Sequence, residues 1–167
     1  NGASLLDCQR ILEELTNSLY DDFSKYKSKV PSSRLREVFS SVVTQTGSKF
    51  VLSQIDSQSN RSQLKESLEL LELAGIIYPV IHSSSNGIPL GAQTNNKFIK
   101  YLLFDTGIFQ RYLNLDLSEL FLNTEISLIN KGVIAELYAV LELIKSQSQN
   151  PASALYYWQR EKKGSGK

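Results

Sequence analysis

The chain has 167 residues, of which 41% are hydrophobic and 21% charged, so it is long enough to bury a core as one domain or as two small ones. Eighteen basic side chains balance seventeen acidic ones, which gives no general electrostatic case for a dedicated nucleic-acid-binding protein. No run approaches the ~20 apolar residues of a membrane-spanning helix and no signal peptide is visible, so we expect a soluble, cytoplasmic protein without membrane contact. The single cysteine, Cys8, fits a reducing compartment, and we expect it to be an inert, partly buried thiol.

The first part of the chain predicts two helices. Apolar residues recur at three- and four-residue steps over residues 4–27, as in a long amphipathic helix. Pro31 interrupts this pattern, and one of the serines after it is expected to cap a second helix over residues 34–46. Gly47 would end the second helix in a left-handed conformation.

The stretch over residues 51–96 carries the clearest structural signal. A short, partly β-like segment leads through a polar turn into an amphipathic helix over residues 60–74, which Gly75 should stop. Asn86-Gly87, flanked by apolar runs, is a signal for a two-residue hairpin turn. We expect strands near residues 76–82, 88–93 and 98–104, and the whole pattern predicts a winged helix-turn-helix.

After residue 104 the sequence again predicts mainly helices. Asp105 should cap a helix that reaches about residue 113, and residues 116–124 look like a connection. A strong helix over residues 126–145 is followed by an aromatic-rich strand over residues 154–158. We therefore divide the chain into an N-terminal amphipathic helix (1–30), a winged-helix domain (31–116) and a helix–strand appendage (117–167). The fold class predicted is α+β, mainly helical.

Four polar residues at the start of the helix over 60–74 are candidate DNA contacts, because in a winged helix this element enters the major groove. They are Asn60, Arg61, Gln63 and Lys65. Further along the same helix Glu66, Glu69 and Glu72 would repel a polyanion, and the tip of the hairpin carries no lysine or arginine. The sequence therefore favours an internal or protein-binding role for this module over contact with DNA.

Neither a metal site nor a catalytic site is visible. His82 is the only histidine and has no cysteine or histidine beside it, and no serine lies in a nucleophile-elbow motif. Glu136 lies among apolar neighbours in the helix over 126–145. Taken by itself, it is a glutamate that reaches solvent or pairs with a nearby cation.

Several segments, in this order, resemble the C-terminal region of a prokaryotic family of predicted AAA-type ATPases. They are Leu70 to Ile77, Ile88 to Ala92, Lys100 to Gly107, Asn130 to Glu136 and Tyr156 to Glu161. The resemblance implies that a P-loop ATPase domain precedes a winged-helix region and that a segment similar to the PD-(D/E)xK restriction-endonuclease fold comes last. Glu136 matches the acidic position on the first helix of that fold. The later metal-binding carboxylates would lie beyond Lys167, so a single carboxylate remains, too few for a hard-cation site.

On this resemblance we expect a non-catalytic accessory module of an AAA-type ATPase, cut from a longer chain and acting through protein or domain contacts. Its partners would be the ATPase domain of the same parent chain and a further protein or a second copy. ATP and Mg²⁺ belong only to the missing ATPase domain, and no cofactor is expected here. The alternatives are a DNA-binding winged helix and a part of a metal-dependent nuclease in the longer protein. We also expect the strand near Leu155 to Trp158 to pack on the winged-helix body or on a second copy, because a lone strand seeks pairing.

Overall fold

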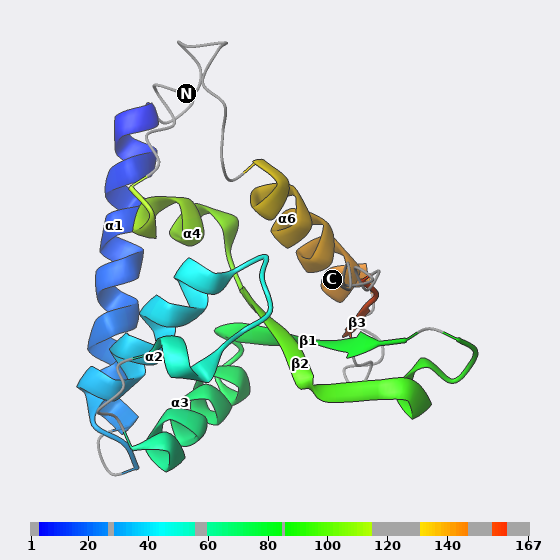
Figure 1. Ribbon diagram of the computed structural model, residues 1–167. Coiled ribbons are helices and arrows are strands. Elements are labelled where there is room, and N and C mark those ends of the chain that lie inside the picture. The colour runs from blue at the N-terminus through cyan, green and yellow to red at the C-terminus, as the bar shows by residue number, and fades with distance from the viewer. Residues whose placement is uncertain are drawn as a thin grey trace, which may run out of the picture.

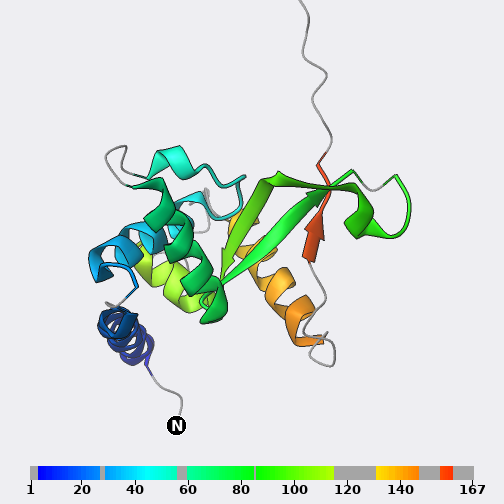
Figure 2. The same cartoon turned by 90° about the horizontal axis from the view of Figure 1, so that it is seen from below.

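The protein is described by a computed structural model over residues 4–26, 29–55, 60–84, 86–114, 131–146 and 155–159. The fold is α+β and mainly helical, as predicted, with a three-stranded sheet of order β2-β1-β3 in the described part of the chain. Helices α1 to α4 gather on one side, and the β1–β2 pair extends away from them (Figure 1). Helix α6 and strand β3 lie beside this pair (Figure 2).

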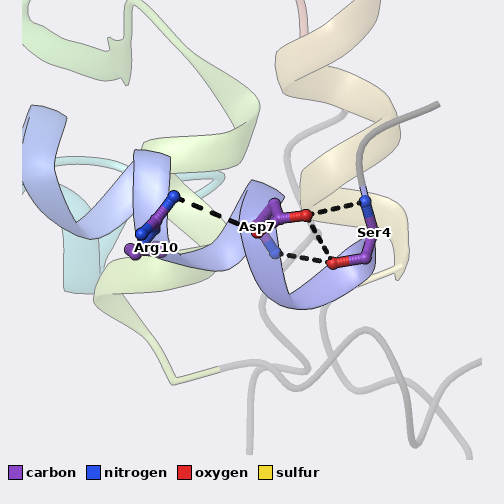
Figure 3. A network of polar contacts seen from close by, with 3 residues as sticks. All are labelled: Ser4, Asp7 and Arg10. Carbon is purple, nitrogen blue, oxygen red and sulfur yellow. Dashed lines mark hydrogen bonds and ion pairs between the residues drawn. The ribbon is translucent and has the colours of Figure 1, made fainter. Parts of the chain in front are cut away.

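Helix α1 (Leu5–Asp22) is the long amphipathic helix that the sequence predicts, and a 3₁₀ turn (Phe23–Tyr26) continues it. Its start is a capping box: the Asp7 backbone N–H donates to Ser4 Oγ at 3.2 Å, and the Ser4 N–H donates to Asp7 Oδ2 at 3.2 Å (Figure 3). The Ser4 hydroxyl also donates to Asp7 Oδ2, at 2.7 Å, and this bond, followed by the one from the Ser4 N–H, lowers the pKa of the Asp7 carboxyl. Cys8 is exposed rather than partly buried, because the apolar sector of α1 is wider than the face that the core covers.

Helices α2 (Ser32–Gln45) and α3 (Arg61–Leu73) form the centre of the helical side. The prediction that a serine caps α2 is wrong: the residue before the helix is Pro31, and no side-chain hydrogen bond caps this end. At the other end, Gly47 has a φ of +86°, and Gly75 beyond α3 has a φ of +68°. Both helices therefore end at glycines in the left-handed region, as their sequences predict.

Strands β1 (Ile77–Ser83) and β2 (Thr94–Leu103) pair antiparallel, from Ile77 opposite Leu103 to Ser83 opposite Thr94. The expected strand over residues 88–93 is not formed. A 3₁₀ turn (Leu90–Gln93) occupies this place, and β2 absorbs the strand expected over residues 98–104.

The connection between the strands is also longer than the two-residue turn predicted at Asn86-Gly87. Side-chain bonds hold it: Ser83 Oγ donates to the Leu90 carbonyl, and Gln93 Oε1 accepts from the Asn86 N–H and from Ser84 Oγ. These bonds across the loop stabilise a wide connection in place of a tight hairpin.

Helix α4 (Thr106–Tyr112) begins as predicted, with Asp105 Oδ1 accepting from the Ile108 N–H at 2.8 Å. Helix α6 (Lys131–Ser146) covers most of the helix predicted over 126–145, and residues 126–130 lie outside the described part, as does the connection at 116–124. Leu137 of α6 is fully buried in the same core as Phe39 and Leu103. Helix α6 therefore packs on the core that α2 and the sheet build.

Strand β3 (Leu155–Tyr157) pairs parallel with β1, from Val80 opposite Leu155 to His82 opposite Tyr157. A Cβ on Gly91 would lie 2.9 Å from the Tyr156 hydroxyl oxygen, so this side chain reaches the loop before β2. The expectation that the strand packs on the body of the molecule is confirmed, although Trp158 remains 61% exposed.

Candidate functional site

A groove of about 830 Å³ lies between the segment that follows α2, the first turns of α3, and β2. Cationic side chains from all three elements line it: Lys49, Arg61, Lys65 and Lys97. Its apolar lining consists of Phe50, Val51, Leu52, Ile55, Leu64, Leu68, Ile99 and Tyr101. None of the described lining residues is acidic, so the groove combines an apolar floor with a positive rim.

A buried glutamine holds the wall that carries Lys49. Gln45 Oε1 accepts from the Val51 N–H at 2.7 Å, and its Nε2 donates to the Val51 carbonyl at 3.3 Å and to Ser41 Oγ at 2.8 Å. The Phe50 N–H donates to the Ile99 carbonyl at 2.8 Å. The segment before the 3₁₀ turn (Leu52–Gln54) is thus fastened to α2 on one side and to β2 on the other.

Aromatic rings position the groove side chains contributed by this wall. The Lys49 ammonium lies over the Phe98 ring, 3.6 Å from its centroid. The Phe50 and Tyr101 rings meet edge to face, with centroids 5.1 Å apart. Lys49 is therefore held by a ring of β2, and two further rings face one another in the groove lining.

The residues expected to contact DNA separate into two pairs. Arg61 and Lys65 are exposed and line the groove. Asn60 caps α3, its Oδ1 accepting from the Ser62 N–H at 2.9 Å, and Gln63 is half-buried and does not line the groove. The structure therefore brings Arg61 and Lys65 together and gives Asn60 a structural role.

Two carboxylates of α3, Glu69 and Glu72, act on Tyr101, which lines the groove. Burial raises the pKa of Tyr101 to about 12, and the negative charges of Glu72 and then Glu69 add to this effect. The pKa of Glu72 is itself raised, first by burial and then by Glu69. These carboxylates act on Tyr101 and therefore place negative charge beside the end of the groove that Tyr101 lines.

Glu136, the residue matched to the nuclease-like acidic position, belongs to a different cluster. Its Oε1 lies 2.7 Å from Lys100 Nζ, and the Lys100 side chain is 15% exposed. Lys100 Nζ lies 5.0 Å from the centre of the Tyr157 ring, and that ring contacts His82 edge to face at 5.2 Å. The cluster joins α6, β2, β3 and β1.

Among residues 4–26, 29–55, 60–84, 86–114, 131–146 and 155–159, no three histidine, cysteine, aspartate or glutamate side chains are grouped to hold a metal ion. No helix in these ranges is both long and apolar enough to cross a bilayer.

Two cationic residues of the groove, Lys49 and Lys97, were missed by the sequence analysis. They come from a loop and a strand, and only the pairing of chain segments brings them beside α3. A signal for Lys97 was present, since Lys97, Ile99 and Tyr101 alternate along β2 and all three line the groove.

These features define a mainly helical α+β protein with a cationic groove beside its third helix. Residues 4–119 match the model of a family described as a domain of unknown function (DUF8612), and the chain belongs to this family. No curated protein and no solved structure matches the chain.

Proposed function

We propose that this chain is a winged-helix module that serves as a non-catalytic accessory part of an AAA-type ATPase and works by contact with other proteins or domains. The order α2, α3, β1, β2 supports the winged helix, with β1 and β2 paired antiparallel and joined by an extended loop. The ATPase assignment rests on the resemblance described above.

The observation that carries a contact function is the uncovered apolar stripe of α1. Cys8, Ile11 and Leu15 follow one another at helical spacing and are exposed, Ile11 to 46% and Leu15 to 50%. Residues at this spacing are neighbours on a helix surface, and a contiguous exposed apolar patch marks an interaction site more often than scattered apolar residues do. The partner proposed for this stripe is the ATPase domain of the same parent chain.

The test uses this chain and the separately produced ATPase domain that the proposal places upstream of it, with association measured by calorimetry. Ile11→Ser with Leu15→Ser should weaken association by at least about tenfold, because both side chains would lose an apolar partner surface. Leu73→Ser, at a residue 83% exposed on α3, is the matched control and should leave association unchanged. The proposal fails if the stripe variant binds as the wild type does, or if the upstream sequence encodes no ATPase.

The appendage formed by α6 and β3 is proposed as the start of a nuclease-like domain in the longer protein. Glu136 lies on α6 ahead of β3, which supports this assignment, while its ion pair with Lys100 gives the residue a structural role in the present arrangement. If the longer protein binds no Mg²⁺ or Mn²⁺ and leaves DNA intact, the nuclease proposal is abandoned.

Nucleic-acid binding is a second candidate function, and the cationic groove favours it. Lysine and arginine side chains on the start of α3 and on β2 lie where a winged helix would meet a phosphate backbone. Binding at low salt should fall steeply as salt is added, and Arg61→Ala with Lys65→Ala should reduce it at least about tenfold. This candidate is excluded if no DNA or RNA binds at low salt.

A further inference from the structure

The cations of the groove differ from most others in the described part of the chain. There, ion pairs engage Arg10, Lys25, Arg34, Lys100, Arg111 and Lys145. None of these pairs includes Lys49, Arg61, Lys65 or Lys97, and all four of these residues are exposed. Four cations outside these ion pairs therefore gather in one hollow, which fits an anionic ligand. Lys29 and Arg36 also belong to none of these pairs, but neither lines the groove, and the Arg36 guanidinium lies over the Tyr20 ring.

The shape of the site argues against a duplex as the preferred ligand. A helix that reads a duplex stands out from the protein surface and enters a major groove about 12 Å wide. Arg61 and Lys65 instead form one wall of a hollow whose other walls carry Lys49 and Lys97. A duplex would reach only the rim of this hollow, whereas a thin extended chain would reach its floor.

The floor is suited to bases. Phe50 and Tyr101 expose part of their rings to the groove, among the aliphatic side chains of Leu64, Leu68 and Ile99. Sites for single-stranded nucleic acid combine a positive groove along the backbone with aromatic rings under the bases. The positive rim and the aromatic floor are both present here.

We propose that the groove binds a short single strand of nucleic acid, with phosphates at the four cationic side chains and bases on the floor around Phe50 and Tyr101. This inference rests on the nucleic-acid-binding candidate above and names its ligand. Glu69 and Glu72, near Tyr101, end the positive field and restrict the site to a few nucleotides.

The test measures fluorescence anisotropy of the whole chain at about 50 mM salt with labelled oligothymidylate and oligouridylate of about twelve nucleotides, a duplex of equal length, and polyglutamate. We expect a single strand to bind at least about tenfold more tightly than the duplex or polyglutamate. Lys49→Ala with Lys97→Ala should weaken single-strand binding at least about tenfold and reduce the salt slope by about 1.4. Lys25→Ala with Lys145→Ala, two exposed lysines on other elements, is the control and should change neither quantity.

Phe50→Leu keeps an apolar side chain but removes the ring, and it should weaken single-strand binding at least about fivefold with the salt slope retained. Circular dichroism and thermal unfolding establish that each variant is folded.

If the duplex binds as tightly as a single strand and Arg61→Ala with Lys65→Ala weakens it, the single-strand inference is overturned while nucleic-acid binding stands. If polyglutamate binds as tightly as the single strand, the groove is a site for acidic protein segments and the inference is overturned. If no nucleic acid binds, the single-strand inference and the nucleic-acid-binding candidate both fail.

Discussion

Lys97 and Lys100 lie three residues apart on β2 and have opposite surroundings. Lys100 is largely buried, forms an ion pair with Glu136 and lies over the Tyr157 ring. Lys97 is exposed at the rim of the groove and belongs to no ion pair among the described residues. One lysine holds α6 and β3 to the sheet, and the other is available to a ligand.

The contrast separates two regions that should respond differently to substitution. The contacts of α6 with the sheet are intramolecular and satisfied, so changes there should alter the free energy of unfolding. The groove cations form none of the ion pairs, and only Lys49 lies over a ring, so changes at these residues should alter binding and leave stability nearly constant.

The largest effect is expected at Leu137, the fully buried residue of α6. Leu137→Ala should lower the free energy of unfolding by about 2–5 kcal/mol, because it leaves a cavity in the shared core. Leu143→Ala, at a residue of the same helix that is 51% exposed, should cost less than about 1 kcal/mol. Urea unfolding measures the free-energy change of both variants. If Leu137→Ala costs as little as Leu143→Ala, α6 contributes no buried contact to the core.

The next largest effect on the free energy of unfolding is expected at Lys100, and Lys97 is its comparison. Lys100→Met leaves the half-buried Glu136 carboxylate without its cation and should lower the free energy of unfolding by about 1–2 kcal/mol. Lys97→Met should change it by less than about 0.5 kcal/mol. A double-mutant cycle with Glu136→Gln isolates the pair, and a coupling energy of zero would contradict a stabilising ion pair between Lys100 and Glu136.

A smaller effect is expected at alkaline pH from Tyr101, whose pKa is raised to about 12 by burial and by the nearby Glu72 and Glu69. Because the folded pKa lies above the ordinary value of 10.0, the neutral phenol contributes stability that is complete below about pH 10. That contribution is lost as the pH rises toward about 12. Tyr101→Phe should reduce the loss of stability over this range by about 1 kcal/mol, allowing for partial exposure. Identical pH profiles for the two proteins would contradict a buried phenol.

The smallest effect concerns the acidic end of the groove. Glu69→Gln with Glu72→Gln removes two charges that repel a polyanion and should raise the affinity for oligothymidylate about threefold, or about 0.6 kcal/mol. Glu14→Gln, at an exposed residue of α1, should not change it. A merely structural role for the groove predicts no gain in either variant.

The elements set by local physics were predictable from the sequence. Helical periodicity gave α1, α2 and α3, and the left-handed glycines Gly47 and Gly75 marked two of their ends correctly. The side chain of Asp105 likewise marked the start of α4. In each case the signal and the structural requirement lie within a few residues of one another.

The wrongly predicted serine cap of α2 is a local error. Elsewhere the sequence was insufficient where groups outside the local motif decide the outcome. The Asn86-Gly87 signal predicted a tight turn, but Gln93 and Ser83 bond across the loop and keep it wide. The parallel register of β3 on β1 depends on partners from opposite halves of the sequence. Of the candidate site, the sequence identified Arg61 and Lys65 on one helix face, while Lys49 and Lys97 needed the tertiary fold to join them.

The central place of β1 bears on the order in which the chain folds. Its pairing with β2 is local, whereas its pairing with β3 closes a long loop, and non-local contacts of this kind form late. Until β3 docks, one backbone edge of β1 is open and presents unpaired amide and carbonyl groups. At high concentration the β3 segment of another molecule would compete for that edge, so exchange of this segment between copies is the characteristic misfolding route expected for this topology.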